Sequence, residues 1–313
     1  MAEITGHPLY RIHTIDSAMN SLWEFYKKKF PVLFIISLIV SLITQYISTR
    51  INFAELQTIT DPQEMLLRMK DYVVPMLLIT ALNLLFTTVL HYYVIYNPLS
   101  PENTPVRCSI NSLRYLIPYL VIIILLAFFG SVLLVLGLAA LIVGAFLAAL
   151  YIITIYMFIL PVMMVEGPNI GNTITRTIRL SHRNFWSNAG WTAVFLVIII
   201  VISVIFSGLI LLPFTGSFMK VFSSPEEVAS IPELASNPAY IILTSVVNAF
   251  VFPLLPVFAS ILYFNSRARE DQAAGEEKYN GHDNKVRVED LYAKPLPEED
   301  PEKTNTGRRD QWE

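Results

Sequence analysis

Charged residues are scarce in this sequence, and cysteine is almost absent. Only 15% of the 313 residues are charged and 54% are hydrophobic, whereas soluble domains carry about 25% charged residues. A water-soluble fold is therefore not expected. The single cysteine, Cys108, cannot form an internal disulfide, and no CxxC or Cys/His cluster indicates a metal site. We expect no cofactor.

The residue sets that common enzymes need are missing as well. There is no G-x-S-x-G nucleophile elbow and no P-loop, and the apolar stretches contain no aspartate. The histidines are too scattered for a histidine-rich metal centre, at His7, His13, His91, His182 and His282. We therefore expect a protein that is not an enzyme. The net charge of −3 does not favour a nucleic-acid partner.

Long hydrophobic runs are abundant. A bilayer core about 30 Å thick is crossed by roughly 20 apolar residues in a helix, because a helix satisfies its own backbone hydrogen bonds in lipid. Residues 115–165 carry no charge and are long enough for two spans, with a tight hairpin centred on Gly137. We predict an all-α membrane protein with six spans, at residues 31–48, 72–96, 115–135, 139–164, 188–212 and 239–264.

Basic residues cluster beside these spans on one side, whereas the other side holds Arg50, Arg68, Lys70 and Lys220 with carboxylates interleaved. Cytoplasmic loops of membrane proteins retain lysine and arginine, and every second connection here is basic. The clusters are Lys27 to Lys29, Arg107 with Arg114, Arg176 with Arg179 and Arg183, and Arg267 with Arg269. Both termini are therefore expected in the cytoplasm.

A short amphipathic stretch precedes each odd-numbered span. Residues 19–22 and 110–113 resemble each other, and Ile170, Ile174 and Ile178 form an apolar stripe at helical spacing before the fifth span. This pattern predicts three units, each an interfacial helix followed by a transmembrane hairpin. Ordinary amphipathic loops would give a similar pattern, so true repetition stays open. Residues 1–30 form the N-terminal segment, and the polar residues 265–313 are expected to be a disordered cytoplasmic tail.

Two groups of polar residues are candidate sites. Guanidinium groups suit phosphate, so an anionic headgroup could bind a cytoplasmic cluster made of Glu166, Arg176, Arg179, Arg267 and Arg269. Local ion pairs are the alternative. Within the spans, a polar stripe could line a cavity, at Asn83, Thr87, His91 and, on the last span, Asn248. Hydrogen bonds between helices are the alternative there.

Three segments carry a resemblance to a known family. They are residues 161–168, which end a span in proline and an acidic residue, the basic helix at 176–181, and the ending Tyr-Phe-x-x-Arg at 263–267. Together they resemble the bacterial membrane domain fused to some glycerophosphoryl diester phosphodiesterases, and related stand-alone six-span proteins. The resemblance implies a protein of the bacterial cytoplasmic membrane connected with lipid or envelope metabolism. It implies no catalytic residues, because a tail of 49 residues cannot hold a barrel of about 250 residues.

The sequence thus favours a non-enzymatic integral membrane protein that binds lipids, or binds a protein partner through its C-terminal tail. A small-molecule transporter or channel with a cavity between the hairpins is the alternative.

Overall fold

The computed structural model describes residues 4–51, 61–100, 102–212 and 237–283, and among these residues it contains helices and no strand. A short 3-10 helix, Ile4–Gly6, opens the chain. The α-helices are α1 (Ile15–Ser48), α3 (Pro62–Tyr96), α4 (Pro105–Ala139), α5 (Leu141–Glu166), α6 (Ile170–Arg183), α7 (Phe185–Leu211), α10 (Pro238–Val251) and α11 (Leu254–Asp283). Residues 1–269 form one compact unit, which is described below.

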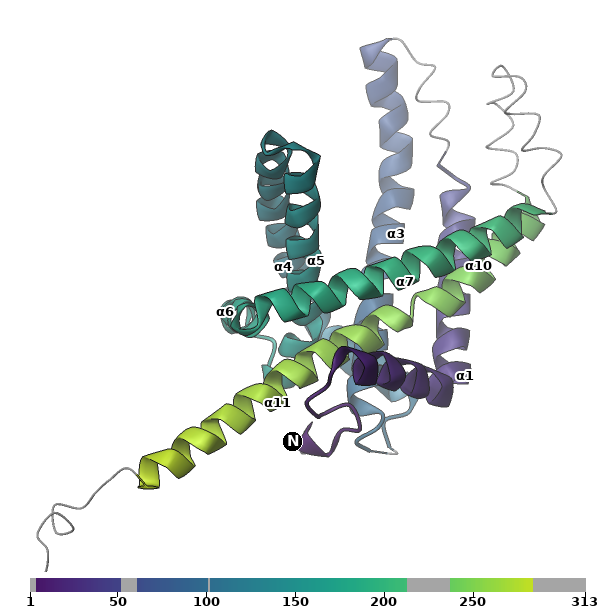
Figure 1. Ribbon diagram of the computed structural model, residues 1–313. Coiled ribbons are helices and arrows are strands. Elements are labelled where there is room, and N and C mark those ends of the chain that lie inside the picture. The colour runs from purple at the N-terminus through teal and green to yellow at the C-terminus, as the bar shows by residue number, and fades with distance from the viewer. Residues whose placement is uncertain (1–3, 52–60, 101, 213–236, 284–313) are drawn as a thin grey trace, which may run out of the picture. The chain divides into compact units, whose positions relative to one another are not determined.

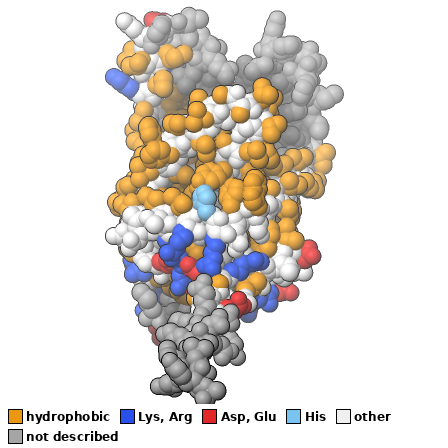
Figure 2. Space-filling view, turned by 60° about the vertical axis from the view of Figure 1, so that its left-hand side comes forward, with side chains coloured by type: hydrophobic (Ala, Val, Ile, Leu, Met, Phe, Trp, Pro, Cys, Tyr) orange, Lys and Arg blue, Asp and Glu red, His pale blue; other side chains and the backbone are white. Residues whose placement is uncertain are grey.

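Six helical segments are long and apolar enough to cross a membrane: α1, α3, α4, α5, α7, and α10 together with α11. Their outward surfaces are apolar; Ile142, for example, is 84% exposed. Figure 2 shows hydrophobic side chains over the middle of one face, with lysine and arginine side chains gathered below them. An apolar surface of this extent is suited to lipid and not to water. The prediction of a six-span membrane protein is confirmed at this level.

Polar caps explain where several helices begin. The Asp61 side chain accepts a hydrogen bond from the N–H of Gln63, and Pro62 follows it in the first turn. Thr104 and Asn237 act in the same way ahead of α4 and α10, again followed by proline. A capping side chain satisfies a backbone N–H that has no partner inside the helix, and proline has no such N–H to satisfy.

Consecutive spans pack as hairpins. α1 contacts α3, α4 contacts α5, and α7 contacts α10. Neighbouring hairpins also touch, through the pairs α3 with α4, α5 with α7, and α10 with α1, so the contacts close a ring. In Figure 1, α4 and α5 stand side by side, and α7 runs obliquely beside α10. The three hairpin units expected from the sequence stay a prediction, because contacts between neighbouring hairpins are as extensive as those within them.

The predicted interfacial helices are only partly separate elements. α6 is a separate helix, because Gly167, with a φ of +112°, and Pro168 end the helical conformation after α5. Residues 19–22 and 110–113 instead lie inside continuous helices, α1 and α4. No comparable break separates them from their spans. α1 does change direction along its length in Figure 1, and it contains Pro31, which removes one helical hydrogen bond and favours a kink.

The sixth span is not one helix as expected. α10 ends at Val251 and α11 begins at Leu254, with Pro253 in the break. The carbonyl of Phe250 lies at this break, where residues 252 and 253 are not helical, and lipid offers no donor to a carbonyl left unpaired there. Tyr26 of α1 supplies one, its hydroxyl donating to the carbonyl of Phe250 at 2.9 Å. α11 then continues to Asp283, so residues 265–283, expected to be disordered, are helical; residues 284–313 lie outside the described part.

The first turns of α11 form the centre of the core. Residues 257–259 and 261–264 are completely buried, as expected for a helix that is apolar on all sides. The Phe258 ring stacks on Phe195 of α7 with ring centres 4.1 Å apart. The N-terminal segment covers the other side, where His7 stacks on Phe264 and the His13 N–H donates to Asn265 at 2.9 Å.

The α4–α5 hairpin turns four residues later than predicted. Gly137 lies inside α4, and the chain reverses at Ala140 and Leu141, where Leu141 has a φ of +70°. Gly137 instead permits a close approach: a Cβ added there would lie 2.7 Å from the carbonyl oxygen of Gly144. Small residues allow such backbone contact between membrane helices.

Replacing Gly144 with alanine should therefore destabilise the protein. The added Cβ would collide with the backbone oxygen of Gly137, which cannot move independently of α4. We expect a loss on the order of 1–3 kcal/mol, as for overpacked cores, measured as a lower midpoint of thermal unfolding in detergent.

Gly208→Ala is the matched control, because a Cβ at Gly208 meets no atom within 4 Å and alanine is the better helix former by about 0.5–1 kcal/mol. Equal midpoints for the two variants would contradict the close packing of the hairpin.

His7 ties the N-terminal segment to α3 as a neutral imidazole. Its Nδ1 accepts from the N–H of Leu9 at 3.1 Å, and its Nε2 lies 3.1 Å from the carbonyl oxygen of Val94. Since Nδ1 accepts, Nε2 carries the proton and donates. In a continuous helix the carbonyl of Val94 would bond to residue 98, which is proline. Burial lowers the pKa of His7 from 6.5 to about 4, outweighing the raising effect of the bond to Val94.

This burial predicts a pH-dependent stability. The unfolded chain binds a proton to His7 below about pH 6.5, whereas the folded chain resists it until about pH 4. The neutral form therefore stabilises the fold fully above pH 6.5, and this contribution is lost as the pH falls towards 4. A shift of this size corresponds to about 3 kcal/mol.

In the variant His7→Gln, the side-chain amide can still donate to Val94 but does not titrate. Its thermal midpoint should fall less than that of the wild type between pH 7 and pH 4.5. The same decrease in both proteins would show that His7 does not contribute.

Candidate functional site

Glu166, the last residue of α5, is the centre of the basic cluster. The Arg176 side chain comes from α6, and its Nε lies 2.9 and 2.7 Å from the two carboxylate oxygens of Glu166. α11 contributes two further donors to Oε1: the hydroxyl of Tyr263 at 3.1 Å and Nη1 of Arg267 at 3.4 Å. One carboxylate thus joins three helices.

The five residues predicted for this cluster do not all converge. Glu166, Arg176 and Arg267 meet as described, and Arg179 lines a pocket of about 260 Å³ together with Glu166 and Arg176. Arg269 lies elsewhere: it donates to Asn265 and to the carbonyl oxygen of His13. This last arginine therefore fixes the N-terminal segment to α11.

One carboxylate, that of Glu166, is shared by two arginines of the cluster, Arg176 and Arg267. The Arg176 side chain is 10% exposed and that of Glu166 is 25% exposed, so the pair is shielded from bulk water. A guanidinium that already bonds a carboxylate is a weaker phosphate ligand, because the carboxylate repels an incoming anion. The geometry of Arg176 and Arg267 therefore favours the alternative, a local ion-pair network that holds α5, α6 and α11 together.

Two tyrosines missed in the sequence help to position Glu166. The hydroxyls of Tyr96 and Tyr115 lie 2.7 and 3.3 Å from the carbonyl oxygen of Met164. A continuous helix would bond that oxygen to residue 168, which is proline. Pro168 could have indicated an unsatisfied carbonyl at Met164, but the sequence does not show which side chains from other helices reach it.

The polar stripe of the second span does not form one cavity. Asn83 and Thr87 line a pocket of about 420 Å³ between α3, α5, α7 and the α10–α11 break, among mostly apolar residues. His91 is buried, and its Nδ1 lies 2.8 Å from the carbonyl oxygen of Thr87 on the same helix. Neither His91 nor Asn248 is among the described residues that line this pocket.

No metal centre emerges from the described part of the chain, where no three His, Cys, Asp or Glu side chains are grouped to hold an ion. Cys108 is buried, and its Sγ lies 3.5 Å from the carbonyl oxygen of Asn103.

No protein-family model, curated protein or solved structure matches this chain. The resemblance to the membrane domain of the phosphodiesterases therefore stays a prediction from the sequence.

Replacing Glu166 with glutamine should destabilise the fold, because it leaves Arg176 partly buried without its carboxylate. Removing one partner of a buried pair costs roughly 3–5 kcal/mol, and we expect about half of that here because Glu166 is partly exposed. The midpoint of unfolding in urea or on heating measures the effect.

Glu102→Gln provides the comparison. Glu102 pairs with Arg107 at a similar distance, 3.1 Å, but its side chain is 77% exposed, so its loss should change stability by less than about 1 kcal/mol. If both variants lose equal stability, the Glu166 network does not hold the helices together.

Proposed function

We propose that this chain is a non-enzymatic integral protein of the bacterial cytoplasmic membrane, with both termini in the cytoplasm, and that α6 binds anionic lipid headgroups. The main support for the proposal is the surface of α6 and the first turn of α7, where basic side chains and a tryptophan are exposed side by side.

One face of α6 packs against the bundle, burying Thr173, Thr177 and Leu180. The opposite face exposes Arg179, His182 and Arg183, next to a Trp186 side chain that is 81% exposed. Exposed tryptophan beside arginine is typical of the membrane–water interface, where the ring lies at headgroup level. A basic residue near an anionic membrane surface contributes about 1 kcal/mol to binding.

An apolar groove beside α6 supports the same proposal. It has a volume of about 330 Å³ and lies between α4, α5 and α6. Phe129, Gly130 and Ile152 line it from the spans, and Ile174 and Ile178 from α6. A lipid whose headgroup contacts Arg179 could place part of an acyl chain along this groove, because its lining is almost entirely apolar.

The transporter alternative has weaker support. Its pocket holds Asn83 and Thr87 but is otherwise mostly apolar, and a path for polar solutes needs several converging polar groups. The resemblance to the phosphodiesterase membrane domains adds the expectation of a role in lipid or envelope metabolism. A protein partner bound by the C-terminal tail remains part of the proposal, and residues 284–313 lie outside the described part of the structure.

The double variant Arg179→Gln/Arg183→Gln tests the proposal. We expect the wild type to retain anionic phospholipid through purification in mild detergent, and the variant to bind it roughly 30-fold more weakly and to retain correspondingly less, given about 1 kcal/mol for each arginine. Phospholipid extraction followed by mass spectrometry measures the amount per protein.

Arg68→Gln/Lys70→Gln is the matched control. It removes the same charge from two exposed residues near the N-terminal end of α3. The proposed orientation places this end of the helix outside the cytoplasm. Equal lipid contents in the two double variants, or no change in either, would contradict binding at α6.

A further inference from the structure

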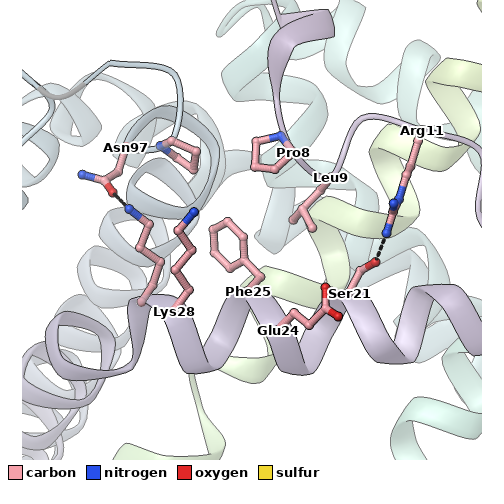
Figure 3. Close-up of a pocket in the computed structure, with 10 residues that line it drawn as sticks. Pro8, Leu9, Arg11, Ser21, Glu24, Phe25, Lys28 and Asn97 are labelled. Atoms are coloured by element: carbon pink, nitrogen blue, oxygen red, sulfur yellow. Dashed lines mark hydrogen bonds between the residues drawn. The ribbon is translucent and has the colours of Figure 1, made fainter.

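A second basic feature lies at the N-terminal segment, which the sequence did not identify as a site. A hollow of about 490 Å³ is bounded by three parts of the chain: residues 8–11, the first turns of α1, and residues 97–98 after α3. Figure 3 shows the side chains around it. Its volume is in the range of about 300–1,000 Å³ found for small-molecule sites. The lining residues are Pro8, Leu9, Arg11, Ser21, Glu24, Phe25, Lys28, Lys29, Asn97 and Pro98.

The inner wall of the hollow is apolar and well packed. Leu9 and Phe25 are 3% and 6% exposed, and Phe25 stands between Lys28 and Leu9 in Figure 3. Behind this wall, the His7 ring stacks on the Phe25 ring and is hydrogen-bonded to the carbonyl oxygen of Val94 in α3. The shape of the hollow therefore depends on the folded N-terminal segment.

Two of its three cations are held in place by neutral groups. Nη2 of Arg11 donates to the hydroxyl of Ser21 at 2.7 Å, and Nζ of Lys29 donates to Oδ1 of Asn97 at 2.6 Å. The Asn97 amide is itself oriented, because its Nδ2 donates to the carbonyl of Asn103. Arg11 and Lys29 are thus positioned without losing their charge to a carboxylate.

Lys28 adds the third charge. Within the described part of the chain, its ammonium makes no hydrogen bond, and no carboxylate lies within ion-pair distance of Arg11, Lys28 or Lys29. In Figure 3 the Lys28 side chain rises from α1 beside Phe25, whereas Glu24 lies beside Ser21. The hollow therefore has three cations and one carboxylate on its lining.

This arrangement differs from the Glu166 network, where the carboxylate bonds the arginines directly. Like charges held close together repel, and a bound anion relieves that repulsion. Lys28 and Lys29 are consecutive residues of α1 that line the same hollow, and two ammonium groups can both donate to a phosphate, which accepts hydrogen bonds in several directions.

We propose that this hollow binds a phosphate group, carried either by a lipid headgroup or by a soluble phosphate compound, with Lys28 and Lys29 as its ligands and Arg11 as a further positive charge on the opposite side of the hollow. The apolar wall formed by Leu9 and Phe25 then contacts the part of the ligand next to the phosphate. The site is separate from the lipid-contacting surface of α6.

The test has two arms that distinguish the sources. In one, inorganic phosphate is titrated into the full-length protein in zwitterionic detergent and followed by calorimetry. In the other, the protein is placed in phosphatidylcholine nanodiscs with a small fraction of phosphatidic acid, and bound lipid is counted by native mass spectrometry. Binding in the lipid arm alone assigns a headgroup site; binding in both arms assigns a site that also takes soluble phosphates.

Lys28→Gln should weaken binding in the responding arm by roughly ten-fold, as expected for loss of a charge-assisted hydrogen bond. Lys27→Gln is the control, because Lys27 is exposed on the same helix, carries the same charge and does not line the hollow. The variant Arg179→Gln/Arg183→Gln should leave this binding unchanged as well. A failure of the α6 proposal can then be distinguished from a failure of the proposal for the hollow. The proposal is overturned if the wild type binds in neither arm, or if Lys27→Gln weakens binding as much as Lys28→Gln.

Discussion

The fold depends on one kind of interaction: near three helix ends, a backbone carbonyl finds its donor on a side chain from another segment of the chain. Lipid supplies no such donor. His7 donates to Val94 ahead of Pro98, Tyr96 and Tyr115 donate to Met164 ahead of Pro168, and Tyr26 donates to Phe250 at the break before Pro253. Each bond joins segments distant in sequence. The helix breaks are therefore also the points where the N-terminal segment, α1 and α4 attach to their neighbours.

The sequence was informative wherever a local pattern decides the structure. Uncharged runs located the six spans, and the stripe of Ile170, Ile174 and Ile178 indicated the helix α6 before the fifth span. Prediction from the sequence failed where contacts between distant helices determine the structure. Proline at position 253 is compatible with a kinked helix as well as a broken one, and nothing local shows that Tyr26 reaches the break. The hairpin position was misread because Gly137 serves helix packing and not the turn.

The candidate site shows the same division. Clustering of arginines near the ends of spans predicted that Glu166, Arg176 and Arg267 meet, but not that the carboxylate occupies both guanidinium groups. Charge compensation depends on side-chain geometry. Two basic regions that look alike in sequence therefore differ in structure. In one, the arginines bond a carboxylate and join helices; in the other, Arg11 and Lys29 bond neutral groups. The second depends on residues 8–11, which have no helical pattern to draw attention to them.

The contacts of His13 bear on the order in which the molecule can be assembled during synthesis. Its N–H donates to Asn265, and its carbonyl accepts from Arg269, so residues made first bond to residues made more than 250 positions later. These bonds cannot form until the last span has left the ribosome and entered the bilayer. The N-terminal segment can therefore attach in two stages: His7 can bond Val94 once α3 has been made, whereas the contacts of His13 close the bundle only after the last span is in place.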